Sequence, residues 1–494
     1  MCSKTSTMIT KKVLLQYSLL VIGLAGVTVY MGDWQVAIAA WFAPIFLLCF
    51  LRNTRFFGFV AAFIGFAIVS AIAQKGIIPV DDFGLQLFNT IKFAITFSIP
   101  FIIDRIFYKQ GSSFWLTFIY PVVLVIEEYL FSISPFGTWG ILPHSQLSFP
   151  VLLQMSSLTG MFGITCIVAW FASVVNWIWE HNFSIQSLKI GGITYTSILF
   201  VILLYGGVKL TFYPVELKTV KVAAISSETN IFYIIPDAKN AKKYISSHKD
   251  IEAQIQLTRD AVREGAKIIA WHEGALILDS KNIFELTHRL KQIADAYDAY
   301  ILMSYLELSV RENEKPFNNK AVLFDKDGET VWEYKKSKLG PGPEQEATNA
   351  GDAKLPYVDT KYGRLSTAIC FDMEFPKLIH QAGKNQVDIL LVPGCDWKGI
   401  TPIHTKMASL VAIQNSFNLV RIAGPGLSAA YNYYGEIIAQ KNSFYSGNGI
   451  LYAEVPVYAP NSLYAMTGNI FSWICIAALL AFLIWYFIKK PAKE

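Results

Sequence analysis

Long apolar runs of close to twenty residues fill the first 214 positions of the chain, and one more run closes it. A helix that crosses about 30 Å of hydrocarbon needs about 20 apolar residues, so each run is long enough to span a membrane. A buried helical core of a soluble protein does not need runs of this length. The pattern predicts an α-helical membrane bundle of about eight spans, at residues 13–30, 34–51, 56–73, 87–103, 114–131, 151–179, 190–212 and 470–488.

Between the seventh and eighth runs the pattern changes to short β-rich segments that alternate with amphipathic ones. KTVKVAAIS and AKIIAWHE predict strands, and DIEAQIQLTRDAVREG between them predicts a helix that ends at Gly265. KAVLFD and ETVWEYKK, joined by a KDG turn, predict a hairpin. Strands alternating with helices are typical of an α/β domain. We therefore expect a bundle of about seven spans at 1–214, an α/β domain at 215–460, and a final span with a tail at 461–494.

Composition agrees with a chain that lies partly in lipid. Of 494 residues, 53% are hydrophobic, and the mean hydropathy is +0.39. The formal net charge of +5 is small, and the basic residues are scattered, which argues against a nucleic-acid partner. The six cysteines form no CxxC pair and no metal-ligand spacing, so we expect neither a metal ion nor a cofactor.

Basic residues mark one side of the predicted bundle. With eight spans, all loops rich in Lys and Arg fall on the same side, which the positive-inside rule assigns to the cytoplasm. The opposite loops, such as the acidic loop at 79–82, are poor in both. The α/β domain between spans seven and eight is therefore expected outside the cytoplasmic membrane. The basic positions are Lys4, Lys11, Lys12, Arg52, Arg55, Arg105, Lys109, Lys189, Lys489, Lys490 and Lys493.

Three reactive side chains fall near the ends of strand-like segments in the α/β domain. Glu273 ends AKIIAWHE, Lys336 ends ETVWEYKK, and Cys370 lies near the end of RLSTAICFD. In α/β folds, groups at strand ends are fixed by the sheet and surrounded by the following loops. A carboxylate can remove a thiol proton, a thiolate can attack an acyl carbon, and an ammonium can stabilise the resulting oxyanion. Together the three residues predict an acyl-transfer site.

Each of the three residues also has a structural interpretation. A strand cysteine is more often part of the core, a glutamate at a strand end is usually solvated, and Lys336 lies beside Lys335 and Lys338. Residue types and spacing alone leave both interpretations open.

The order Glu, Lys, Cys resembles the nitrilase superfamily, also called carbon–nitrogen hydrolases. AICFDMEFP is similar to the superfamily's nucleophile elbow, and YKKSKLGPGPE is similar to its lysine motif. The resemblance implies an αββα sandwich in which Glu273, Lys336 and Cys370 are catalytic. It also implies supporting roles for Glu344, which would hold Lys336, and for Asp372 of the elbow.

Seven spans, an external nitrilase-like domain and a last span resemble the plan of the apolipoprotein N-acyltransferases. GTWGILPHSQLSFPVLLQMSSLTGMFGIT is similar to a loop and span of that family, and the segment from Asp396 to Gly435 is similar to its late region. The resemblance implies a multi-pass protein of the bacterial cytoplasmic membrane. Its expected partners are a phospholipid acyl donor, a lipoprotein acceptor and membrane lipid, and the acyl group would pass through a cysteine thioester.

Two alternatives remain open. The sequence CFDMEFP is closer to soluble amidases, because Asp372 stands where the acyltransferases usually have Glu; this favours an anchored amidase or nitrilase-type hydrolase that uses the same three residues. A membrane assembly protein with a decayed nitrilase domain is the non-enzymatic alternative, and the presence of all three reactive residues argues against it.

Other polar positions have weaker interpretations. Glu127 and Glu128 lie near the end of the fifth span, where an ionisable group is either functional or placed at the interface. His144 and His404 could line a substrate path or be solvated. Cys395, in VPGCDW, is expected to be a core or pocket-wall thiol, and Trp397 is expected near the pocket mouth.

Overall fold

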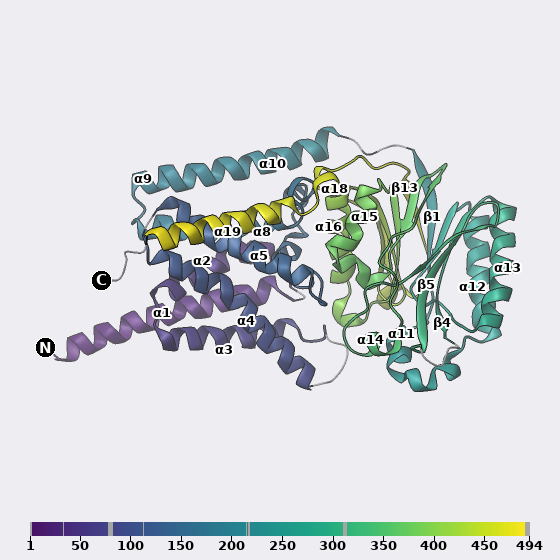
Figure 1. Cartoon of the computed structure of the whole chain (residues 1–494), viewed down its shortest axis with the longest axis horizontal. Helices are drawn as coiled ribbons and strands as arrows, with labels where there is room; N and C mark the ends of the chain where they lie inside the picture. Colours follow the sequence, from purple (N-terminus) through teal and green to yellow (C-terminus); the bar gives the residue numbers. More distant parts are fainter. Residues whose placement is uncertain are drawn as a thin grey trace. The chain divides into compact units, whose positions relative to one another are not determined.

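The computed structural model describes residues 2–32, 34–77, 83–111, 113–213, 215, 218–309 and 314–489 (Figure 1). The acidic loop at 79–82 and the tail residues Lys490 and Lys493 lie outside these ranges. The chain forms two compact units. Met1–Phe131, Gly140–Thr211 and Asn469–Glu494 belong to the first, and Ser132–Trp139 and Phe212–Gly468 belong to the second. The short segment Ser132–Trp139 thus belongs to the second unit, although the residues on both sides of it belong to the first.

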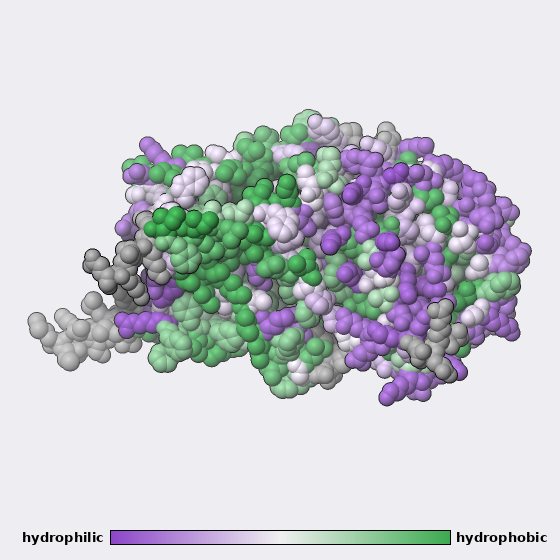
Figure 2. All heavy atoms as spheres, viewed as in Figure 1, coloured by the Kyte–Doolittle hydropathy of each residue, from purple (hydrophilic) through white to green (hydrophobic). Residues whose placement is uncertain are grey.

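The first unit is the predicted bundle of apolar helices. Apolar side chains cover most of its visible surface (Figure 2). The helix α2 (Ala37–Asn53) is apolar but has 17 residues, and it packs against α1 and α8. Seven helices among the described residues are long and apolar enough to cross a membrane: α1 (Cys2–Tyr30), α3 (Phe56–Ala73), α4 (Phe83–Tyr108), η1 with α5 (Phe114–Ser132), α8 (Phe162–Glu180), α9 to α10 (Ile185–Phe212) and α19 (Ile470–Lys489).

The sixth apolar run is shorter as a helix than the sequence predicts. Residues 151–179 were expected to form one span, but the structure divides them into α6 (Pro150–Leu153), α7 (Ser156–Thr159) and α8. Gly160 follows α7 with φ 70°, a conformation that is open to glycine and unfavourable for other residues. The chain therefore turns at Gly160, and the spanning helix starts at Phe162.

Two groups of buried polar side chains in the bundle have hydrogen-bond or ion-pair partners. Arg52 contacts Asp104 at 2.7 Å and Glu180 at 3.0 Å. Glu128 is buried and accepts hydrogen bonds from the Leu142 amide at 2.6 Å and the Thr165 hydroxyl at 2.5 Å. These bonds satisfy both oxygens of Glu128, which favours a structural role for this residue within the bundle.

The second unit contains two β-sheets. One has the order β13-β1-β2-β4-β5-β6, with β3 beside β4, and the other has the order β12-β11-β10-β9-β8-β7. In the first sheet β1, β2 and β4 are parallel, and in the second β8, β9 and β10 are parallel. The strands are β1 (Thr219–Ser226), β2 (Ile268–Trp271), β3 (Ile277–Leu278), β4 (Tyr300–Leu308), β5 (Phe317–Phe324), β6 (Thr330–Lys335), β7 (Tyr357–Thr360), β8 (Gly363–Thr367), β9 (Ile389–Gly394), β10 (Asn418–Ala423), β11 (Leu427–Tyr431), β12 (Ile437–Asn442) and β13 (Gly449–Pro456).

Helices cover the outer face of each sheet, which gives the predicted αββα sandwich (Figure 1). On one side α12 (His248–Arg263) and α13 (Ser280–Tyr297) pack on the first sheet, and on the other α16 (Ile403–Asn415) packs on β10 and β11. α15 (Pro376–Lys384) lies against α16, and the sheets meet where β1 contacts β10 and β2 contacts β9. The loops that follow these facing strands therefore lie close to one another.

The helix α12 shows how the local sequence sets these layers. Ser247 and Asp250 form a capping box that satisfies the first backbone amides of the helix. The helical repeat then places Ile251, Ile255, Thr258 and Val262 on the buried face, and Gly265 follows the helix with φ 86°. The prediction of this helix is confirmed, and so is the prediction of a hairpin, formed by β5 and β6.

Candidate active site

The Lys336 ammonium lies between two carboxylates. Glu273 follows β2, Lys336 follows β6, and both side chains are buried. Lys336 Nζ donates to Glu273 Oε1 at 2.8 Å and to Glu344 Oε1 at 2.6 Å, where Glu344 belongs to α14 (Pro343–Ala347). Burial acts to lower the pKa of Lys336, but the two carboxylates outweigh it and raise the pKa well above the usual value. The lysine is therefore a fully charged cation inside the protein.

The two oxygens of Glu273 have different surroundings. Oε1 accepts hydrogen bonds from Lys336 Nζ and from Asn319 Nδ2, each at 2.8 Å. Oε2 is buried and accepts no hydrogen bond from the described residues. The carboxylate is thus held by one oxygen, while the other has no competing donor and can receive a proton.

Cys370 lies in a strained turn. The sequence predicts it near the end of a strand, but β8 ends at Thr367, and Cys370 opens the 3₁₀ turn η5 (Cys370–Glu374) with φ 50°. A left-handed residue other than glycine in a turn between strand and helix is typical of a nucleophile elbow. Burial and Glu273 raise the pKa of the Cys370 thiol well above its usual value, against the lowering effect of Lys336 and Arg421. The resting sulfur is therefore a thiol, and it needs a base before it can attack.

Asp372 connects the elbow to the lysine loop. Its Oδ1 accepts the backbone amides of Ser337 at 3.2 Å and Lys338 at 2.7 Å, and its Oδ2 accepts the Tyr334 hydroxyl at 2.8 Å and the Ile369 amide at 2.9 Å. Burial raises the pKa of Asp372 to about 6, and hydrogen bonds from Ile369, Tyr334 and Lys338 together with the charge of Lys336 limit that rise. One buried carboxylate thereby fixes the residues beside Lys336 relative to those beside Cys370.

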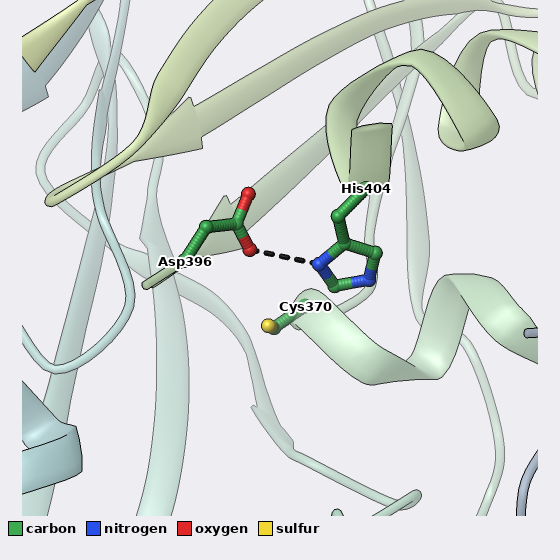
Figure 3. A group of neighbouring side chains, drawn as sticks. All are labelled: Cys370, Asp396 and His404. Carbon is green, nitrogen blue, oxygen red and sulfur yellow. Dashed lines mark hydrogen bonds and ion pairs between the residues drawn. The ribbon is translucent and has the colours of Figure 1, made fainter. Parts of the chain in front are cut away.

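A second group of charges, which the sequence did not predict as a unit, lies close to Cys370. Arg421 Nη2 donates to Asp396 Oδ1 at 2.9 Å, and His404 Nδ1 lies 2.8 Å from the same oxygen. His404 Nε2 is 3.5 Å from Glu374 Oε1. A His404 nitrogen, an Asp396 oxygen and the Cys370 sulfur lie within 4.8 Å of one another (Figure 3). All these side chains are buried.

This second group had a sequence signal. Asp396 comes two residues after the strand VDILLVPG, and Arg421 is the single charge in the strand NLVRIAG. The two strands become neighbours as β9 and β10, which brings Asp396, in the turn after β9, next to Arg421 of β10. Burial acts to raise the pKa of Asp396, but Arg421 and His404 outweigh it and hold that pKa at about 2. For His404, burial and Arg421 act to lower the pKa, and Asp396 and Glu374 outweigh them and raise it.

The segment Ser132–Trp139 is attached to the elbow. The Thr138 hydroxyl donates to Glu374 Oε2 at 2.7 Å, and the Thr138 amide donates to the Glu374 carbonyl at 2.9 Å. The Trp139 ring meets the His404 ring edge to face, with 5.7 Å between centroids. A piece of chain that directly follows α5 thus contributes to the surroundings of the nucleophile.

Thiol, imidazole and carboxylate are also metal-binding types, and Cys370, Asp396 and His404 are the residues of these types that come together here. The Arg421 guanidinium lies 2.9 Å from both Asp396 Oδ1 and His404 Nδ1. A cation between these atoms would be repelled by Arg421, so the group fits an ion-pair network better than a metal site.

Two other positions singled out in the sequence border this region. Cys395 is fully buried directly after β9, and its carbonyl lies 3.9 Å from Cys370 Sγ. Trp397 is half-buried and meets Phe232 edge to face, with 4.7 Å between centroids. His144, by contrast, lies in η2 (Leu142–Gln146) of the first unit.

The catalytic unit and the bundle each match a known family. A model of the family described as carbon-nitrogen hydrolase matches residues 223–459, and this is the class of enzyme that the fold and the site define. A model described as apolipoprotein N-acyltransferase N-terminal domain matches residues 23–174. The chain belongs to the apolipoprotein N-acyltransferases, as a divergent member within the carbon–nitrogen hydrolase superfamily.

The chain is also similar, at low sequence identity, to individual relatives and to solved structures. The chain is similar to an apolipoprotein N-acyltransferase of Geobacter metallireducens, with 23% identity over 89% of each chain. It is also similar to that of Rickettsia typhi, with 21% identity over 74% of each chain. A crystal structure of an amidase from Nesterenkonia sp. covers 49% of this chain and 93% of its own, with 17% identity and a TM-score of 0.42.

Proposed function

We propose that this membrane N-acyltransferase moves a fatty acyl chain from a phospholipid, through a thioester on Cys370, to the α-amine of a diacylglyceryl cysteine on a lipoprotein. One observation carries the proposal: the buried Lys336 is bonded to Glu273 and Glu344, and the charges of Glu273 and Lys336 both act on Cys370, which lies in a left-handed elbow. The family membership of the chain supports the acceptor, because the relatives are named as apolipoprotein N-acyltransferases.

In the first half-reaction Glu273 Oε2 takes the proton of Cys370, and the thiolate attacks an ester carbonyl of the donor. Lys336 stabilises the oxyanion of the tetrahedral intermediate, while Glu344 keeps the ammonium in place. The intermediate collapses to a thioester, and the proton on Glu273 passes to the departing lysophospholipid oxygen. In both half-reactions Asp372 holds the residues that follow Lys336 in a fixed position relative to the turn that contains Cys370.

In the second half-reaction the lipoprotein amine attacks the thioester carbon. The C–N bond forms, the C–S bond breaks, and Glu273 carries a proton from nitrogen to sulfur. The amide leaves, and the thiol of Cys370 is restored. Water has to be kept from the thioester, which agrees with the burial of Cys370 and Glu273.

The apolar helices suit substrates that stay in the bilayer. Each buried CH₂ contributes about 0.8 kcal/mol to lipid retention, so drawing an acyl chain into water would be prohibitive. We assign membrane anchoring and substrate access to residues 1–214 and 461–494, and catalysis to 215–460. By the positive-inside rule, the catalytic part lies outside the bacterial cytoplasmic membrane.

The test is to incubate the purified protein with a fluorescent phospholipid and a diacyl lipopeptide. We expect a fluorescent triacyl lipopeptide from the wild type and from Cys395→Ala, a matched control for a neighbouring buried thiol, and none from Cys370→Ala. Ammonia release from small amides without any acylated lipopeptide would contradict the proposal and would indicate the anchored hydrolase instead.

A further inference from the structure

An open apolar groove lies in the first unit between α3 and α4, which run side by side (Figure 1). Its volume is about 260 Å³. Of its lining residues, Ala62 and Phe66 are buried, and Val60 and Phe63 are exposed. The single polar side chain in the lining is Ser98, whose hydroxyl donates to a carbonyl of its own helix at 2.6 Å. On helices that cross a membrane, such a groove is open to lipid hydrocarbon.

The groove extends over about one leaflet of a bilayer. Phe66, the last of its lining residues along α3, lies ten residues after Phe56, where the helix begins. At 1.5 Å per residue this is about 15 Å, which is half of the hydrocarbon thickness of about 30 Å. The groove is therefore as deep as one acyl chain that enters from the Phe56 end.

A guanidinium lies at that end of the groove. Arg105 follows the lining residue Ile102 on α4 by one helical turn. Its guanidinium lies over the Phe59 ring, 4.8 Å from the centroid, and its Nη1 donates to the Leu51 carbonyl. Phe59 and Leu51 both line the groove. Arg105 is thus fixed where the headgroup of a lipid in the groove would lie.

Arg105 differs from the neighbouring Arg52 in its partners. Arg52 is buried and pairs with Asp104 at 2.7 Å and with Glu180 at 3.0 Å. Arg105 is only partly buried, and no carboxylate of the described residues forms an ion pair with it. The charge of Arg52 is therefore neutralised inside the protein, whereas that of Arg105 is open to an anion from the lipid.

We propose that this groove binds one anionic phospholipid, with an acyl chain along Phe63 and Phe66 and the phosphodiester against Arg105. The class is a phospholipid whose headgroup has no amine, because a zwitterionic headgroup brings its own cation to the site. Arg55 and Lys109, both exposed, add positive charge at the same end of the two helices. The proposed orientation places this end in the cytoplasmic leaflet, so the lipid is a bound partner and not the proposed acyl donor.

The test measures which lipid the purified protein retains. The protein in dodecyl maltoside is mixed with equal amounts of ether-linked phosphatidylglycerol and phosphatidylcholine, and bound lipid is counted by native mass spectrometry. Ether-linked chains have no ester carbonyl, so the result does not depend on acyl transfer. We expect the wild type to retain one phosphatidylglycerol about 10-fold in preference to phosphatidylcholine, and Arg105→Gln to lose this preference.

Lys189→Gln is the matched control. Lys189 is also exposed and lies on the side assigned to the cytoplasm, but it belongs to η3 (Leu188–Ile193) and not to the groove. This variant loses the same charge as Arg105→Gln and should keep the preference of the wild type. An equal loss in both variants would indicate a general effect of surface charge and would overturn the site.

Two variants test the acyl chain separately from the headgroup. Ser98→Phe narrows the groove from α4, and Val60→Trp narrows it from α3, so either one serves if the other is unstable. Both keep Arg105, and both should lose the preference for phosphatidylglycerol. Equal retention of the two lipids by the wild type, or an unchanged preference in Arg105→Gln or in the narrowed grooves, would overturn the proposal. Failure of the proposed acyl transfer would leave these ratios unchanged.

Discussion

Lys336 Nζ lies 2.8 Å from Glu273 Oε1, and the side chains on both ends of this contact are buried. Glu344 adds a second carboxylate at 2.6 Å from the same nitrogen. One cation therefore lies between two buried carboxylates and lowers the repulsion between them. The site depends on this lysine for its stability as well as for the oxyanion it is proposed to hold.

Removing the lysine should therefore cost more stability than removing its first partner. Lys336→Met leaves Glu273 and Glu344 without a cation, and we expect a loss of about 3–5 kcal/mol in the free energy of unfolding. Glu273→Gln keeps the Lys336–Glu344 pair, and we expect a smaller loss, about 1.5–3 kcal/mol. Denaturant unfolding of both variants in the same detergent measures the difference. A less stable Glu273→Gln protein would contradict this arrangement of charges.

Asp372 should affect activity by holding the residues beside Lys336 in position relative to those beside Cys370. Asp372→Asn keeps the shape of the side chain but turns an amide donor toward backbone N–H groups that donate to the carboxylate. We expect acyl-enzyme formation to slow by about 100-fold, because the lysine loop and the elbow lose their common anchor. The matched control is Tyr334→Phe, which removes only one of the four donors. Equal rates for wild type and Asp372→Asn, measured by intact mass, would exclude this role.

The alternation of strand and helix periods predicts an α/β domain, and the resemblance to the nitrilase superfamily makes it an αββα sandwich. Glu273, Lys336 and Cys370 stand at the ends of strand-like segments, but it is the same resemblance that singles them out as catalytic. The local sequence does not predict the left-handed backbone of Cys370, since the residues of RLSTAICFD up to the cysteine mostly favour an extended strand. That conformation follows from the turn into α15, where Asp372 accepts the Ile369 amide.

Local sequence patterns do not predict the second group of charges around Cys370. Asp396 and Arg421 meet only because β9 and β10 are neighbours, with Arg421 in register with Val392. Thr138 and Glu374 are 236 positions apart in the chain, and their contact depends on a loop between two apolar helices. An apolar run predicts a span, but it carries no information about what the loop after the span will touch.

The attachment of Ser132–Trp139 can be tested at Gly137. This residue has φ 63°, and an added Cβ would lie 2.7 Å from Glu374 Cβ and from the Glu374 carbonyl oxygen. Gly137→Ala should push the segment away from the elbow and lower the rate of acyl transfer by about 10-fold or more. Gly140→Ala is the matched control, because Gly140 also has a positive φ, 82°, but nothing lies within 4 Å of its added Cβ.

A rate assay with phospholipid and lipopeptide compares the two alanine variants. Both carry the backbone strain of alanine at positive φ, so the difference between them isolates the clash with Glu374. Equal rates for the two would show that the contact between Thr138 and Glu374 has no part in the reaction.

The reactivity of Cys370 in the resting protein is expected to depend on pH. Because burial and Glu273 raise its thiol pKa well above the usual value, the thiolate fraction at pH 7 is small and grows as pH rises. Alkylation of Cys370 by iodoacetamide should therefore accelerate about 10-fold for each pH unit between 7 and 9. The measurement is the mass of the Cys370 peptide in the Cys395→Ala background. A rate that is flat over this range would mean a thiolate at rest and would remove the need for a base.

The most direct measurement is the intact mass of the protein after mixing with phospholipid alone and then with a diacyl lipopeptide. We predict an added fatty-acyl mass that maps to Cys370, is absent from Cys370→Ala, persists in Cys395→Ala, and disappears as triacyl lipopeptide forms. A wild-type protein that makes triacyl lipopeptide without ever carrying an acyl group on Cys370, or that loses the acyl group only to water, would contradict transfer through this cysteine.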